Sequence, residues 1–103
     1  MDGRRVDRDA ARLLGKNLWR ARRRAGYSQE ELGALASIHR THIGYMEIGQ
    51  RLPRVDTLLK VASVLEVRLD ELVDGIVWVL PAPTRPGSFL VEAPGLRGGA
   101  DAS

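Results

Sequence analysis

The chain has 103 residues, contains no cysteine and carries a formal net charge of +3. This length allows one small domain with tails, whose core is too limited for a large substrate cleft, and the lack of cysteine excludes disulfides and cysteine-based zinc or nucleophile chemistry. No apolar run approaches the roughly 18–20 residues of a membrane span and no signal-peptide pattern opens the chain, so we expect a cytoplasmic protein with no membrane contact.

The first expected elements are a flexible N-terminal segment over residues 1–8 and a helix over residues 9–25. The segment is polar with one valine. Along 9–25, leucine and alanine recur at helical spacing, and arginines fill the last turns, where positive charge suits the helix dipole. Gly26 then ends the helix.

Two short helices, over residues 29–36 and 40–48, are expected next, joined by a tight turn. Ser28 and Glu31 fit the capping-box pattern S-x-x-E at the first helix start. In the second helix the apolar side chains point one way, and the other side carries hydrogen-bonding groups and a glycine: Arg40, Thr41, Gly44 and Tyr45. Such a face is suited to the major groove of DNA, where base edges present distinct donor and acceptor patterns. These features predict a DNA-binding helix-turn-helix.

The division of charge along the chain supports a polyanionic partner. Residues 1–54 hold twelve Arg or Lys against six Asp or Glu, a balance of +6, and residues 55–103 hold four against seven, a balance of −3. A basic half beside an acidic half indicates that the first half meets a polyanion. A solvated Arg-rich helix surface is the other explanation of the same charge.

Residues 55–65 have the strongest helical pattern of the chain, and a short fifth helix is expected over 69–73. Two apolar runs, 76–80 and 88–92, are separated by proline and glycine and predict the two strands of a hairpin. From residue 93 to 103 the composition predicts a disordered tail. The core should centre on eight apolar residues: Leu18, Leu32, Leu35, Ile43, Met46, Leu58, Ala62 and Leu65.

The hairpin over residues 76–92 leaves two arrangements open. Ile76, Trp78 and Leu80 alternate onto one side of a strand, and Phe89 is able to lie beside them. A lone two-stranded hairpin is marginal in water, so this side needs cover. The cover is either a second copy of the chain, which makes these residues a dimer interface, or the chain's own helices.

A set of residues between 28 and 53 has the order and spacing of a known signature: Ser28-Gln29, Leu32, Ile43, Glu47-x-Gly49 and Pro53. With them, residues 18–72 resemble the Cro/Xre class of bacterial and phage helix-turn-helix regulators. The stretch HRTHIGYMEIGQR is similar to an HRTYIG-type subgroup that includes restriction–modification controllers. The resemblance implies an all-α, five-helix lambda-repressor-like domain over residues 9–75 with the hairpin appended. It also implies a repressor-like transcription regulator that binds double-stranded DNA. We expect a homodimer, because one short helix covers few base pairs and a two-fold dimer reads two half-sites.

The resemblance assigns roles to individual residues. The positions that contact base edges are matched by the residues of the polar face already described: Arg40, Thr41, Gly44 and Tyr45. The positions that contact DNA phosphates are matched by Gln29, His42 and Arg51. Arg22 and Glu47 match a pair that forms a buried salt bridge and holds the third helix in place.

This chain departs from the class at four positions. Ser37 stands in the turn where the class has glycine, and His39 stands where a small hydroxyl residue caps the third helix. Ile48 and Trp19 replace polar or basic surface residues.

Other kinds of site are less well supported. His39 and His42 share a helix face and could bind a metal, but no cysteine and no obvious third ligand accompany them. No nucleophile motif and no phosphate-binding glycine loop occurs, so we expect no enzyme, no catalytic residue and no cofactor. The main rival function is a helix-turn-helix that acts chiefly by binding a protein partner, as an antitoxin binds a toxin.

Overall fold

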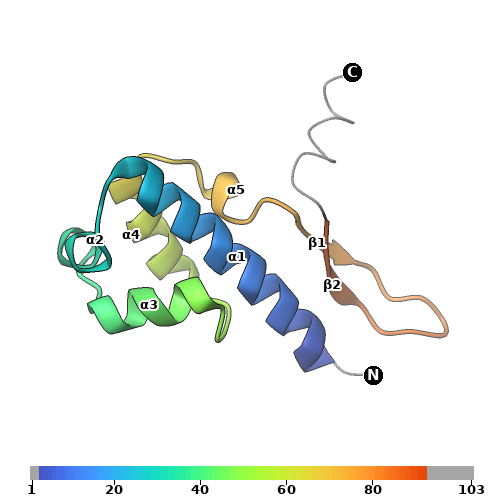
Figure 1. The fold of residues 1–103 in the computed structure, drawn as a ribbon. Helices are drawn as coiled ribbons and strands as arrows, with labels where there is room; N and C mark the ends of the chain where they lie inside the picture. Colours follow the sequence, from blue (N-terminus) through green and yellow to red (C-terminus); the bar gives the residue numbers. More distant parts are fainter. Residues whose placement is uncertain (1–2, 93–103) are drawn as a thin grey trace, which may run out of the picture.

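The computed structural model describes residues 3–92, which form five helices followed by a two-stranded hairpin (Figure 1). The elements are α1 (Gly3–Ala25), α2 (Gln29–Ala36), α3 (Arg40–Ile48), α4 (Val55–Leu65), α5 (Leu69–Leu72), β1 (Ile76–Val79) and β2 (Ser88–Val91). The expected five-helix fold with an appended hairpin is confirmed, and α5 is one residue shorter than predicted. The expected tail over residues 93–103 lies outside the described residues.

Helix α1 begins earlier than the sequence pattern predicts. It starts at Gly3, whereas we expected its start at Asp9 and a flexible segment over residues 1–8. Residues 3–8 are therefore helical. The expectation relied on the buried stripe, but a helix continues past its buried stripe where no glycine or proline interrupts it, and arginine is among the better helix formers.

The core lies between α1 and the four shorter helices. Its fully buried side chains come from every helix of this body: Leu18, Leu32, Ile43, Val61 and Leu72. Seven of the eight predicted core residues are buried, and Leu35 is the exception at 60% exposed. Helix α2 has only eight residues and packs on α3 and α4 through the face of Leu32, Gly33 and Ala36, so position 35 points away from the core.

Helices α1 and α3 pack with their backbones close together. A Cβ atom added at Gly15 would lie 2.3 Å from the carbonyl oxygen of Met46 and 2.6 Å from that of Glu47. Only glycine allows this approach. The seam joins the C-terminal end of α3 to the middle of α1, and from there the two helices diverge (Figure 1).

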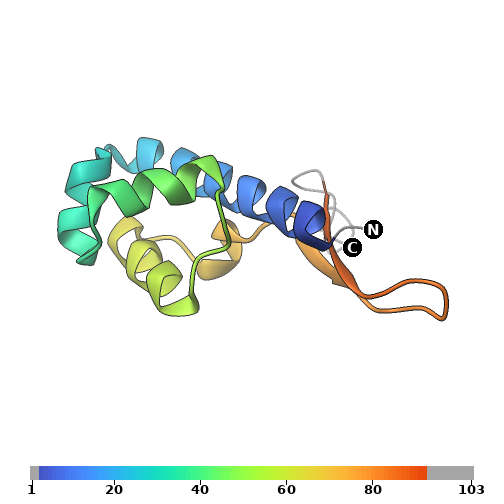
Figure 2. The same ribbon diagram turned by 90° about the horizontal axis from the view of Figure 1, so that it is seen from below.

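The hairpin lies beside α1, and β2 makes most of this contact. Its strands are antiparallel, with Ile76 opposite Val91 and Trp78 opposite Phe89. Figure 2 shows the loop of the hairpin reaching away from the helical body. The hairpin therefore gains part of its cover from its own subunit, while Trp78 and Leu80 stay exposed. Among the described residues, no helix has both the length and the apolar character needed to cross a membrane.

Candidate DNA-binding surface

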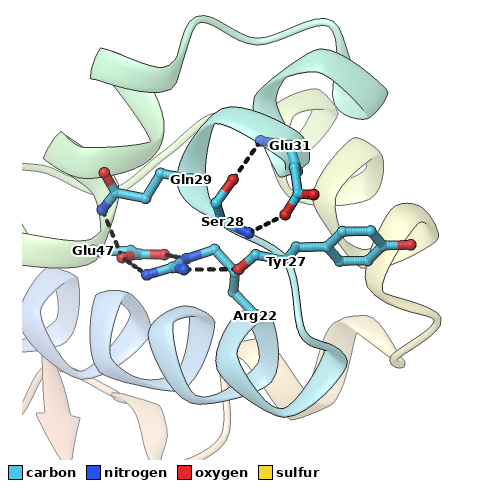
Figure 3. Close-up of polar contacts among 6 residues, drawn as sticks. All are labelled: Arg22, Tyr27, Ser28, Gln29, Glu31 and Glu47. Carbon is cyan, nitrogen blue, oxygen red and sulfur yellow. Dashed lines mark hydrogen bonds and ion pairs between the residues drawn. The ribbon is translucent and has the colours of Figure 1, made fainter.

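The start of α2 is fixed by the capping box that the sequence predicts. The hydroxyl of Ser28 accepts from the backbone N–H of Glu31 at 2.9 Å, and the carboxylate of Glu31 accepts from the backbone N–H of Ser28 at 2.7 Å (Figure 3). The two bonds use backbone donors that would otherwise have no partner at a helix N-terminus. Gln29, the first residue of α2, is thereby held in a defined position.

Behind this helix start, Arg22 of α1 pairs with Glu47 of α3. The Nε of Arg22 donates to one carboxylate oxygen of Glu47, and Nη2 donates to the other at 2.9 Å. The two side chains are 9% and 4% exposed. Nη1 donates to the carbonyl oxygen of Tyr27 at 2.9 Å, so one guanidinium joins α1, α3 and the loop before α2. The hydrogen bond to Glu47 raises the pKa of Arg22 above its ordinary value, against the opposing effect of burial.

Gln29 has a partner that sequence reasoning missed. Its Nε2 donates to Oε1 of Glu47 at 3.0 Å, so the amide belongs to the same network as the ion pair (Figure 3). The amide has a second N–H, and it lies at the N-terminus of α2, where backbone N–H groups and the helix dipole favour an anion. Arg23 and Arg40 line the same hollow around this helix start, together with the carboxylates of Glu30 and Glu31. Eighteen residues separate Gln29 from Glu47, and no local pattern signals their contact.

Helix α3 is capped by an unusual residue for that position. The Nδ1 of His39 accepts from the backbone N–H of Thr41 at 3.0 Å. The imidazole thus replaces the small hydroxyl residue that the resemblance led us to expect. In the part of the chain that the structure describes, no group of three possible metal ligands includes His39 or His42.

The residues expected to face base edges differ in exposure. Arg40, Thr41 and Tyr45 are exposed, and Tyr45 reaches 50%. Gly44 is half-buried because the amide of Gln29 lies above it, with Oε1 at 3.6 Å from the position of an added Cβ. The structure therefore brings the three side chains to the surface and places Gly44 partly beneath Gln29.

A groove runs between α3 and the start of α4. Its lining residues come from both helices and the loop between them, and they include His39, Thr41, His42, Tyr45, Arg51, Arg54 and Thr57. His42, Arg51 and Arg54 are exposed along it. Arg54, whose Nε lies 3.3 Å from Oδ1 of Asp56, was not among the predicted site residues. Its only signal in the sequence is the positive balance of residues 1–54.

The helix-turn-helix family model (HTH_3) matches residues 20–72, which is just over half of the chain. The chain belongs to this family. The interpretation of residues 18–72 as a Cro/Xre-type domain is thereby confirmed. The matched segment ends before β1, so the hairpin lies outside it.

This helix-turn-helix protein is similar to named regulators. It is 38% identical over 65 residues to the uncharacterised HTH-type transcriptional regulator y4dJ of Sinorhizobium fredii, covering 63% of this chain and 84% of that protein. Its fold is similar to the restriction-modification controller protein C.AhdI from Aeromonas hydrophila, with a TM-score of 0.58 and 34% identity over 60% of this chain and 94% of that one.

A second structural relative is SinR from Bacillus subtilis, the master regulator for biofilm formation, solved in complex with DNA. The TM-score is 0.57 with 31% identity, covering 59% of this helix-turn-helix protein and 98% of that chain. SinR is also known in a complex with the protein SinI.

Proposed function

We propose that this protein is a transcriptional regulator that binds double-stranded DNA at specific sites, with α3 in the major groove. The observation that carries this proposal is the exposed polar face of α3, with Arg40, Thr41 and Tyr45, on a helix held from behind by Arg22 and Glu47. A helix with such a face fits the major groove, and a fixed support lowers the cost of ordering it there.

The exposed side chains of α3 recognise the base sequence of the DNA. The guanidinium of Arg40 can donate two bonds to a guanine, and Thr41 and Tyr45 offer hydroxyls and apolar surface to base edges. Gly44, which has no side chain, lets the backbone of α3 approach the DNA closely. Because Gly44 is half-buried beneath Gln29, it leaves room for the DNA and donates no hydrogen bond to it.

Phosphate contacts position α3 without reading sequence. On one side of the helix, Gln29 offers its second N–H at the N-terminus of α2. On the other side, His42, Arg51 and Arg54 line the groove toward α4. The amide donor on one side of α3 and the arginines on the other suit the two phosphate strands that border a major groove.

The working unit is proposed to be a homodimer in the cytoplasm, with residues 9–75 binding DNA and residues 76–92 contributing to the dimer. One short helix covers few base pairs, whereas a two-fold dimer reads two half-sites about 34 Å apart. The dimer residues expected from the sequence are Ile76, Trp78, Leu80 and Phe89. No enzymatic activity is proposed, since the function rests on the polar surface of α3.

In vitro selection from a random pool of duplexes tests the DNA proposal. We expect the parent protein to enrich one motif, with two related half-sites if it binds as a dimer. The variant Arg40→Ala should lose preference at defined positions of that motif. Arg85→Ala, in the hairpin loop and away from α3, is the matched control and should enrich the same motif as the parent. Failure of the parent to enrich any motif would refute sequence-specific binding and favour the protein-binding alternative.

A further inference from the structure

The outer edge of β1 carries backbone groups that the hairpin does not use. The backbone N–H of Glu92 donates to the carbonyl oxygen of Gly75 at 2.7 Å, which makes these two residues a hydrogen-bonded pair of the ladder. Such pairs recur at every second position of an antiparallel ladder. With the observed register, Val77 bonds to Leu90 and Val79 to Ser88. The N–H and C=O of Trp78, between them, therefore point away from β2.

Among residues 3–92, no backbone hydrogen bond outside the ladder involves the N–H or the C=O of Trp78. Helix α1 covers the hairpin mainly at β2, so β1 is the edge farther from the helical body. An open edge strand is a template for another strand.

Nothing in β1 protects this edge from pairing. Proteins usually blunt an open edge with lysine, proline, a bulge or an inward charge. Residues 76–80 contain no charge and no proline, and the strand pairs with β2 without a bulge. Trp78 is 52% exposed and Leu80 is 72% exposed. The edge is thus apolar and carries no charge of its own, and its open backbone groups are centred on Trp78. At its two ends, the N–H of Ile76 donates to the carbonyl oxygen of Val73 at 3.1 Å, and the carbonyl oxygen of Leu80 accepts from Nη1 of Arg85 at 3.1 Å.

The ring of Trp78 is held in place although half of the residue is exposed. It packs edge-on against Phe89 with ring centroids 5.2 Å apart. It also lies close to Gly87, where an added Cβ would be 2.5 Å from the ring atom Cζ2. A ring that is already ordered loses little further freedom when a partner covers it.

We propose that two copies of this chain join by antiparallel pairing of their β1 strands, with the two-fold axis at Trp78. Each Trp78 exchanges both backbone bonds with Trp78 of the partner subunit, and Ile76 lies opposite the partner's Leu80. The result is a continuous four-stranded sheet in the order β2, β1, β1, β2. The choice of a second copy of this chain as the partner of β1 rests on the proposed function, because reading two half-sites needs two copies related by a two-fold axis.

A second copy fits the edge on chemical grounds as well. Antiparallel pairing of a strand with itself gives the same contacts to both copies, which closes the assembly at two subunits. Because residues 76–80 carry no charge, two of these strands meet without repulsion. Pairing about Trp78 also brings the half-exposed Trp78 side chains of the two copies together at the centre of the interface. Aromatic contacts contribute most to association when they lie at the centre.

Introducing a charge at position 78 tests this pairing without DNA. In sedimentation of the full chain, Trp78→Lys should raise the dimer dissociation constant by about 30-fold or more, because two lysines would face each other where two tryptophans packed. Trp78→Glu should do the same. An equimolar mixture of the two variants should recover dimer, because each lysine then faces a glutamate. Leu90→Lys, at an exposed position of β2, is the matched control and should leave the dimer unchanged.

Oxidative cross-linking is a second measurement that does not depend on charge. The chain has no cysteine, so Trp78→Cys introduces a single thiol. Directly opposed residues in a hydrogen-bonded antiparallel pair have Cα atoms about 5.5 Å apart, within the range of a disulfide. Trp78→Cys should therefore form a covalent dimer on oxidation. Leu80→Cys should not, because its partner position is Ile76.

Several results would overturn the pairing: a parent that is monomeric at tens of micromolar, mixed variants that do not recover a dimer, or equal cross-linking at positions 78 and 80. A monomeric parent would mean that another part of the chain covers the edge, or that it stays open. These outcomes are separate from the DNA proposal, because the selected motif is measured on its own. A parent that selects DNA as a monomer refutes only the pairing, and a dimer that selects no DNA refutes only the proposed function.

Discussion

The helix-turn-helix body and the hairpin of this molecule are held in different ways. Helix α3 is fixed by an ion pair, a shared amide and a backbone seam with α1, so two other helices determine its position. The hairpin is held by a short ladder and by the contact of β2 with α1, and it leaves an open edge and a half-exposed tryptophan. In the proposed assembly, the surface that meets a groove of set shape is the rigid one, and the surface that meets a second copy is completed by that copy.

Breaking the ion pair should have the largest effect on the rigid part. Arg22→Ala would leave Glu47 buried without its cation, and we expect the free energy of unfolding to fall by about 3–5 kcal/mol. Thermal and urea unfolding measure this loss. Arg54→Ala removes an exposed pair with Asp56 and is the matched control, with an expected loss below about 1 kcal/mol. Equal melting temperatures for the parent and Arg22→Ala would contradict the structural role of the pair.

The apolar core behind α3 should be nearly as sensitive. Ile43 is fully buried, and Ile43→Ala should lower the free energy of unfolding by about 2–4 kcal/mol. Leu35→Ala removes a side chain of the same size from an exposed position of α2 and should cost much less. Urea unfolding of both variants tests whether burial, rather than apolar character alone, sets the stability of this part. Similar losses in the two would show that the observed orientation of α2 is wrong.

Two variants separate sequence reading from positioning. Arg40→Ala should weaken binding by about 1–3 kcal/mol at particular base pairs of the selected site and little at others. Gln29→Ala should weaken binding about equally on all sequences, because a phosphate contact carries no base information. Competition binding against a panel of single-base variants of the site gives both patterns. Identical patterns for the two variants would contradict the roles proposed for these residues.

The smallest effect concerns the turn between α2 and α3. Ser37 adopts the left-handed conformation with φ of 59°, which costs a residue with a side chain more than it costs glycine. Ser37→Gly should therefore raise the free energy of unfolding by about 0.5–1 kcal/mol. Ser63→Gly, in the regular part of α4, is the control and should lower it by a similar amount. A loss of stability in Ser37→Gly would mean that the serine side chain stabilises the turn.

Elements with local signals were predictable from the sequence. The capping box at Ser28, the helix stop at Gly49 and the apolar run over residues 76–80 each depend on neighbours a few residues away, and each appears in the structure. The pairing of Arg22 with Glu47 was available only through the resemblance, because no local pattern joins positions 25 residues apart.

The error at Leu35 and two features that the sequence did not reveal all depend on tertiary packing. Leu35 was expected in the core as part of an apolar stripe with Leu32 and Ala36, but a helix of eight residues buries a narrow face, and here that face is Leu32, Gly33 and Ala36. The bond between Gln29 and Glu47 depends on how α2 and α3 cross, which follows from tertiary packing and not from either helix alone. Similarly, the free edge of β1 required the register of the ladder, which composition does not specify.

The seam at Gly15 has a consequence for how the site preference of this protein can change. One added methyl group there would collide with the backbone of α3 at Met46 and Glu47. To accept it, α3 would have to tilt or shift as a unit, carrying Arg40 and Tyr45 to new places. A screen of random variants for altered operator choice should therefore yield substitutions at buried positions of α1. Such substitutions would show that the preference for one DNA sequence over another depends partly on the packing of α1 against α3.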